Sequence, residues 1–194
     1  MSAAVETSSG PWLVAGLGNP GDRYPRTRHN IGWLALDALG PEEPFREQTR
    51  FEGYVSRCPG AWLLKPTTFM NLSGVAVRAL ADFHKIPCER VLVVLDDAAL
   101  PFGRLRLRAG GSPGGHNGLE SVLTHFAAEA VPRLRIGIGE PPEPVSLHDH
   151  VLGRFTPAEE EKLPAALARA AEAIRHILKY GLAAAMNEFN KEGL

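Results

Sequence analysis

The run Val91-Leu-Val-Val-Leu95 constrains the fold more than any other stretch of this chain. Its five residues are all apolar, and Asp96 and Asp97 follow directly. A strand without polar residues is typical of the centre of a parallel sheet, where both faces are covered. We therefore expect a buried central strand over Val91–Asp96.

Five further segments have strand-like patterns, and four have helical periodicity. The strand-like segments are Trp12–Ala15, Gly53–Arg57, Trp62–Lys65, Arg104–Arg108 and Arg133–Gly137. The helical segments are Asn30–Leu39, Ser73–His84, Asn117–Phe126 and the chain from Thr156 onward. Strands that alternate with helices predict an α/β fold. We expect one domain over residues 12–194, a three-layer structure in which helices flank a twisted, mixed and mostly parallel sheet.

Two of the helices carry recognisable start signals. Ser73 is a candidate N-cap, and Thr156-Pro-Ala-Glu159 matches a capping box with proline at the first helical position. Pro164 is expected to split or kink the last helical segment, and a second helix would then run to Gly181.

Composition excludes several classes of protein. The 194 residues include 21 basic and 22 acidic ones, for a net charge of −1, which argues against indiscriminate binding to nucleic acid. Cys58 and Cys88 form neither a disulfide framework nor a C-x-x-C site. No apolar run reaches the ~20 residues of a membrane span. Residues 1–11 are expected to be a disordered lead without signal-peptide features, so we expect a cytoplasmic protein.

The segment Gly16-Leu-Gly-Asn-Pro-Gly21 has the G-x-G-x-x-G spacing of a dinucleotide-binding loop. A true fingerprint needs a helix that starts inside the glycine motif, so that backbone amides meet the pyrophosphate. Pro25 would lie in the interior of that helix, where it removes a hydrogen bond and clashes with the preceding turn. We therefore interpret the glycines as a tight turn that presents Asn19 to a ligand.

Polar side chains that could carry chemistry fall at the ends of predicted elements. They are Asn19, His29, Asn30, Asn71, Asp96, Asp97, His116 and Asn117. Ligands of open α/β sheets bind beyond the carboxyl ends of the strands, so Asn19 and Asp96 could share one cleft with His29. A carboxylate on one histidine nitrogen fixes the tautomer and raises basicity, and we identify no serine or cysteine in a nucleophile elbow. The pair therefore favours activation of water. His148-Asp-His150 lacks further ligands at useful spacing, so we predict no metal.

Arginines are grouped more closely than the net charge suggests. Arg104, Arg106 and Arg108 fall on one strand face, and Arg133 and Arg135 repeat that pattern. Arg23, Arg26 and Arg28 flank His29. Beside a glycine-rich loop, such arginines could grip phosphates.

These motifs together resemble the bacterial peptidyl-tRNA hydrolases. The matching segments, in family order, are Gly16–Gly21, Tyr24 with Thr27–Asn30, Lys65–Gly74, Asp96-Asp97 with Leu100-Pro101, Gly114–Gly118, Arg133–Gly139 and Val151–Gly153. The resemblance implies hydrolysis of the ester between a peptide and the 3′-terminal ribose of tRNA. It also implies peptidyl-tRNA as the partner, through its acceptor stem and 3′ end, with no cofactor. The sequence leaves no apolar face without a place in the predicted core, so we expect a monomer.

Residue roles follow from the same resemblance. It implies that His29 is the catalytic base, that Asp96 orients it and that Asn71 is catalytic. Asn19, Tyr24, Phe69, Met70 and Asn117 would bind the substrate, and Arg108 and Arg135 would grip the tRNA near its 5′-phosphate. Which of Asn19, Asn71 and Asn117 donates to the oxyanion stays open. Ala99, where many members have an acid, and Ser112-Pro113 depart from the family pattern.

Two alternatives have other chemistry. One is a non-catalytic RNA-binding relative of the same family, against which the intact set of His29, Asp96 and Asn71 argues. The other is an enzyme like the nucleoside phosphorylases, which shares the general α/β architecture and would need phosphate-dependent cleavage of a glycosidic bond.

Overall fold

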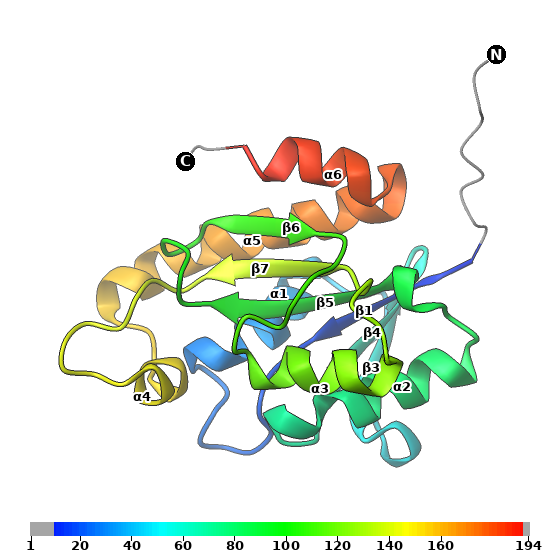
Figure 1. Cartoon of the computed structure of the whole chain (residues 1–194), viewed down its shortest axis with the longest axis horizontal. Coiled ribbons are helices and arrows are strands. Elements are labelled where there is room, and N and C mark those ends of the chain that lie inside the picture. The colour runs from blue at the N-terminus through cyan, green and yellow to red at the C-terminus, as the bar shows by residue number, and fades with distance from the viewer. Residues whose placement is uncertain (1–9, 192–194) are drawn as a thin grey trace.

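The computed structural model describes residues 10–191. Most of the expected disordered lead at 1–11 therefore lies outside the described residues. One seven-stranded sheet runs through the described part in the order β2-β3-β4-β1-β5-β7-β6 (Figure 1). The strands are β1 (Trp12–Gly16), β2 (Arg46–Gln48), β3 (Gly53–Cys58), β4 (Ala61–Pro66), β5 (Val91–Asp97), β6 (Leu105–Arg108) and β7 (Arg133–Gly137).

The apolar run forms the middle of this sheet. All seven residues of β5 are buried, and β5 pairs in parallel with β1 on one side and β7 on the other. β1 also pairs in parallel with β4, while β2, β3 and β6 add antiparallel pairings at the two edges. The sheet is therefore mixed, with a parallel centre, and the predicted central strand is confirmed.

Helices cover both faces of the sheet, which confirms the three-layer α/β fold (Figure 1). One face packs on α1 (Ile31–Leu39), α5 (Pro157–Tyr180) and α6 (Leu182–Phe189). The other face packs on α2 (Ser73–Phe83) and α3 (Asn117–Phe126). A short helix, α4 (Leu147–Leu152), lies between β7 and α5 along the chain. Among the described residues, no helix is long and apolar enough to cross a membrane.

Two glycines bring α1 unusually close to the strands. A Cβ atom on Gly32 would lie 2.4 Å from the backbone oxygen of Val94, and one on Gly16 would lie 2.4 Å from the oxygen of Gly32. Only glycine leaves room for this approach. The start of α1 therefore lies directly against the carboxyl ends of β1 and β5.

Two expectations about helix boundaries are wrong. Pro164 does not divide the last segment, because α5 is continuous around it. Pro164 is exposed, so water can reach the carbonyl that loses its partner. Ser73 is not an N-cap but the first residue of α2, and its hydroxyl donates to the Met70 carbonyl at 2.8 Å. The capping box of Thr156 and Glu159 is confirmed.

Candidate active site

The loop after β1 is fixed by a reciprocal pair of asparagines. The Asn19 N–H donates to Oδ1 of Asn30, and Nδ2 of Asn30 donates back to the Asn19 carbonyl, each at 2.9 Å. Oδ1 of Asn19 accepts from the backbone N–H of Met70 at 2.9 Å. These contacts join the ends of β1 and β4 to the start of α1. Since Oδ1 of Asn19 is occupied, its amide is oriented with the NH₂ group available to a ligand.

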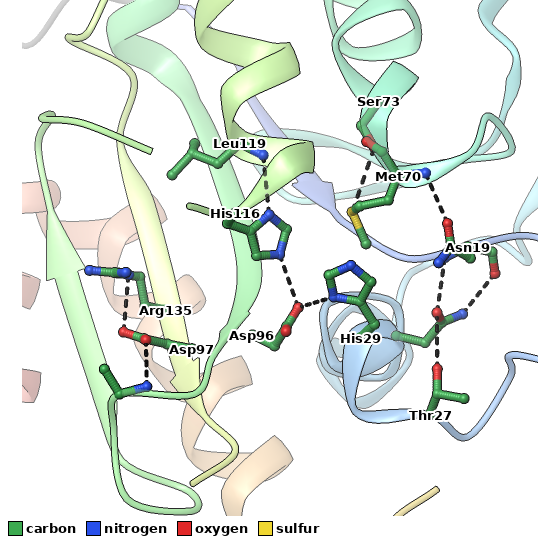
Figure 2. Close-up of polar contacts among 12 residues, drawn as sticks. Asn19, Thr27, His29, Met70, Ser73, Asp96, Asp97, His116, Leu119 and Arg135 are labelled. Atoms are coloured by element: carbon green, nitrogen blue, oxygen red, sulfur yellow. Dashed lines mark hydrogen bonds and ion pairs between the residues drawn. The ribbon is translucent and has the colours of Figure 1, made fainter. Parts of the chain in front are cut away.

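His29 and Asp96 meet as the sequence predicted. His29 lies in a short 3₁₀ turn, Arg28–Asn30, just before α1, and Asp96 lies near the end of β5. Nδ1 of His29 is 2.8 Å from Oδ1 of Asp96, and the other ring nitrogen is turned away from the carboxylate (Figure 2). The His29 side chain is 12% exposed and that of Asp96 only 3%. Asp96 therefore accepts a hydrogen bond from the Nδ1–H of His29, which leaves Nε2 unprotonated as the basic atom of the neutral ring.

His116, one of the polar candidates in the sequence to which no role was assigned, completes the cluster. Its Nε2 lies 3.0 Å from the same Oδ1 atom of Asp96. Its Nδ1 accepts the backbone N–H of Leu119 at 3.2 Å, as the N-cap of α3. One carboxylate oxygen is thus shared by two histidines (Figure 2). The available signal was its position in Gly114-Gly-His-Asn-Gly118, directly before a predicted helix.

The charge of Asp96 depends on these two partners. Burial alone would raise the pKa of this carboxyl, but charge and hydrogen bonding from His116 and His29 hold the pKa well below its usual range. Asp96 is therefore a permanent carboxylate at neutral pH, able to stabilise a protonated His29.

The same three residues are also a candidate cation site. Ligand atoms of His29, Asp96 and His116 all lie within 4.8 Å of one another. However, Nδ1 of His116 accepts a hydrogen bond from Leu119, so the neutral ring carries its proton on Nε2, the atom a metal would need. The arrangement therefore fits hydrogen-bonded histidines better than a metal centre.

The second histidine pair identified in the sequence does not form a cluster. His148 is exposed, whereas His150 is buried and its Nε2 lies 2.9 Å from the Gly139 carbonyl. The two rings therefore have different surroundings.

The remaining predicted site residues lie in three segments: Tyr24 before His29, residues 69–71 after β4, and Asn117 directly after His116. Asn71 is exposed and follows Met70, whose N–H binds Asn19. Asn117 is exposed and follows His116 at the start of α3. Phe69 is 63% exposed and Met70 is buried. Tyr24 is half-buried in the loop between β1 and His29, where its carbonyl accepts the hydroxyl of Thr27 at 2.9 Å.

The arginines of β6 and β7 fall on one face of the sheet, as the alternating pattern predicts. Arg106 is paired in register with Arg135, and Arg108 with Arg133. Arg106 and Arg108 are exposed, and Arg135 is half-buried. The Asp97 carboxylate lies 3.1 Å from Nε of Arg135, an ion-pair distance outside hydrogen-bond geometry. This surface is the candidate phosphate site.

Two other arginines have structural partners instead. Arg133 is 2% exposed, and its guanidinium donates to the carbonyls of Gly111, Ser112, Glu129 and Val131. It therefore holds the glycine-rich loop in place. Arg28 is also buried, and it pairs with Glu159. Neither guanidinium faces solvent, so the suggestion that they belong to a phosphate-gripping group is wrong.

Comparison with known proteins identifies the family of this chain. The family model for peptidyl-tRNA hydrolase matches residues 13–194. The peptidyl-tRNA hydrolase of Chloroflexus aggregans is 49% identical over 186 residues, which cover 92% of this chain and 98% of that protein. That of Gloeobacter violaceus is 48% identical over 184 residues, covering 92% and 93%.

A solved structure has the same fold. The crystal structure of peptidyl-tRNA hydrolase from Acinetobacter baumannii matches with a TM-score of 0.85 at 33% identity, over 93% of this chain and 94% of that one. The match of the family model to nearly the whole chain, together with these relatives, confirms the resemblance. This chain belongs to the peptidyl-tRNA hydrolase family.

Proposed function

We propose that this protein hydrolyses the ester between the peptide and the 3′-terminal ribose of peptidyl-tRNA, releasing free peptide and tRNA. The observation that carries the proposal is the contact of His29 Nδ1 with Asp96 at 2.8 Å. Within the described part of the chain, no group hydrogen-bonds Nε2 of His29, so this atom can accept a proton from water. Membership of the peptidyl-tRNA hydrolase family supports peptidyl-tRNA as the substrate.

The reaction needs only water and the side chains of the site. Nε2 of His29 takes a proton as the water oxygen attacks the ester carbonyl, and Asp96 stabilises the imidazolium that forms. The tetrahedral intermediate then collapses, the bond to the ribose oxygen breaks, and His29 returns the proton to that oxygen. No cofactor or metal is assigned to any step.

Amide groups supply the oxyanion contact. Asn19 binds the N–H of Met70, the neighbour of Asn71 in the chain, and Asn117 directly follows His116; each of the three amides can donate without adding charge. Asn71 is assigned to catalysis, while Asn19 and Asn117, with Tyr24, Phe69 and Met70, bind the substrate. The exposed ring of Phe69 gives the 3′ end or the peptide an apolar surface.

The face of β6 and β7 that carries exposed or half-buried arginines gives the site its preference for RNA. Arg108 and Arg135 lie on the face of β6 and β7 that also carries Arg106. We assign them to the phosphates near the 5′ end of the acceptor stem, where arginine binds two oxygens at once.

The rival proposal is a non-catalytic RNA-binding relative. Such a protein would have no use for a base whose tautomer is fixed by a buried carboxylate. A single-turnover assay with N-acetyl-aminoacyl-tRNA separates the two proposals, because only the enzyme releases the amino acid.

The deciding experiment compares wild type with His29→Ala in that assay. We expect the variant to lose roughly 10²–10⁴-fold in turnover, the usual contribution of general-base catalysis, while it still binds tRNA. Near-wild-type turnover by the variant would show that His29 is not the base.

We further propose a cytoplasmic enzyme, because its substrate is a product of translation, and we propose that it is a monomer. Residues 12–194 would form one catalytic domain. The core cluster that contains Trp12 of β1 also contains Phe189 of α6, which supports a single unit. Sedimentation equilibrium would test the monomer.

A further inference from the structure

Arg28, the residue before His29, is bound to a part of the chain far away in sequence. Its Nε donates to Oε1 of Glu159 at 3.0 Å, and its Nη2 donates to Oε2 at 2.6 Å. Nη1 donates to the His150 carbonyl at 3.2 Å, and the backbone N–H donates to the Gly153 carbonyl at 3.0 Å. The side chains of Arg28 and Glu159 are 8% and 17% exposed. This two-point ion pair is therefore well shielded from water.

Glu159 has a second role at the start of α5. Its Oε2 accepts the Thr156 N–H at 2.6 Å, and its own N–H donates to Oγ1 of Thr156 at 3.3 Å. Glu159, the second member of the capping box of α5, thus also binds Arg28. This arrangement ties the position of the turn containing His29 to the first turn of the longest helix.

His29 consequently lies between two neighbours that are each fixed from a different side. Asn30 is bound to Asn19 in the loop after β1, and Arg28 is bound to Glu159. The backbone of Thr27 forms an isolated bridge with Arg154. A 3₁₀ turn is short and has poor hydrogen-bond geometry of its own, so outside contacts decide where His29 points.

The neighbouring ion pair of Arg26 and Glu160 is much more exposed than the pair of Arg28 and Glu159. Arg26 pairs with Glu160, one residue further along α5, but the two side chains are 56% and 36% exposed. Exposed pairs of this kind contribute little to stability. Arg26 also lies outside the turn Arg28–Asn30, whereas Arg28 is part of that turn.

We propose that Glu159 is a positioning residue for His29, acting through the buried guanidinium of Arg28. Glu159 does not touch the substrate. It holds the turn Arg28–Asn30 so that the His29 ring stays within hydrogen-bond reach of Asp96. The proposal rests on the proposed function, since it assumes that His29 is the base.

The test begins with Glu159→Gln. Glutamine serves as well as glutamate in a capping box, so this change keeps the cap on α5 and removes the charge that Arg28 binds. We expect kcat for N-acetyl-aminoacyl-tRNA to fall on the order of tenfold with KM unchanged, because a small displacement of a catalytic group is costly. Circular dichroism at the assay temperature establishes that the variant is folded.

Two matched controls separate positioning from stability. Glu160→Gln removes the exposed pair one residue away, and we expect wild-type kcat and KM. Thr156→Ala removes the hydroxyl that caps α5 and leaves the Arg28 pair in place. We expect it to lower Tm without changing kcat at temperatures where it is folded.

A double-mutant cycle with His29→Ala gives a readout that a purely structural role would not change. If Glu159 acts through His29, adding Glu159→Gln to His29→Ala should not lower the residual rate further. Arg28→Lys, which keeps the charge but loses the two-point geometry, should show the same non-additive loss and serves if Glu159→Gln does not fold.

Three results would overturn the proposal: equal kcat for Glu159→Gln and Glu160→Gln, additive losses in the cycle, or a loss in Thr156→Ala as large as that in Glu159→Gln. These results differ from failure of the proposed function, in which His29→Ala itself would turn over like wild type.

Discussion

Nε2 of His116 lies 3.0 Å from Oδ1 of Asp96, the oxygen that also contacts His29. Because Leu119 donates its N–H to the other nitrogen of His116, the proton of the neutral ring points at Asp96. The carboxylate that orients His29 is therefore itself oriented from the glycine-rich loop. The Asp96 side chain has two donors, His29 and His116, which leave its carboxylate little freedom to rotate.

Replacement of His116 should impair the chemical step. We expect His116→Ala to lower kcat about ten- to a hundredfold, because Asp96 loses one of its two side-chain donors, and a hydrogen bond to a charged group is worth roughly 1.5–3 kcal/mol. KM should change little. Steady-state hydrolysis checks this, with the exposed His148→Ala as the control. Unchanged kcat in His116→Ala would mean that Asp96 is held without this histidine.

Asp96 should make stability depend on pH at the acid end. Burial opposes its charge, but His116 and His29 outweigh burial and lower its pKa from the usual 3.8. A carboxyl with a lowered folded-state pKa stabilises the fold above its unfolded pKa, and this stabilisation is lost as the pH falls through the folded value. We expect the advantage of wild type over Asp96→Asn in free energy of unfolding to shrink below about pH 4, by up to about 1.4 kcal/mol per pH unit.

Urea unfolding at a series of acid pH values measures that advantage. Asp22→Asn, at an exposed position outside the site, is the control for the loss of one carboxylate. A wild-type advantage that stays constant as the pH falls below about 4 would contradict the lowered pKa of Asp96.

Most of the strands could be predicted because their signal is local. β5 is uniformly apolar, and β6 alternates apolar and basic residues, which its burial pattern follows. β2 was missed because Arg46, Glu47 and Gln48 are all polar and become a strand only by pairing with β3 at the sheet edge. α4 was missed because it has six residues, too few for a periodic pattern, and α6 lies beyond Gly181, where the expected helix ended.

Within the site, too, only the residues with a local sequence signal could be predicted. His29 and Asp96 could be paired from sequence, because the carboxyl end of a central strand and the start of a neighbouring helix meet at one edge. His116 could not, since the path of a glycine-rich loop follows from no periodicity. Nor could the burial of Arg133, because its acceptors are backbone carbonyls that any sequence would supply.

The two types of arginine on β7 should respond differently to substitution. Arg135→Ala should raise KM for the tRNA substrate and reduce the salt dependence of binding by about one phosphate contact, with little loss of stability. Arg133→Ala should instead lower the free energy of unfolding by roughly 1–3 kcal/mol, because four carbonyls lose a buried donor. Binding titrations over a salt series and urea unfolding measure the two effects.

Arg108→Ala should follow Arg135→Ala, because its exposed side chain lies on the same face. If all three variants shifted the salt dependence equally, the division between a phosphate-binding and a loop-holding arginine would be wrong.

Asn19 offers a way to separate binding of the oxyanion from support of the loop. Its Oδ1 accepts the Met70 N–H, and no described residue accepts from its Nδ2. Asn19→Asp keeps an acceptor for Met70 but replaces the donor by a negative charge. Asn19→Ala removes both groups. If the amide donates to the oxyanion, Asn19→Asp should lose roughly 10²–10³-fold in kcat, and more than Asn19→Ala.

Stability should rank the two variants in the opposite order. Asn19→Ala leaves the buried N–H of Met70 without its acceptor, which costs about 1–3 kcal/mol, whereas Asn19→Asp retains that contact. Asn19→Asp should therefore have the lower rate in single-turnover hydrolysis, and Asn19→Ala the lower free energy of unfolding in urea. If instead Asn19→Ala were worse in both measurements, Asn19 would act only by holding Met70 in place, and Asn71 and Asn117 would remain as the candidate donors.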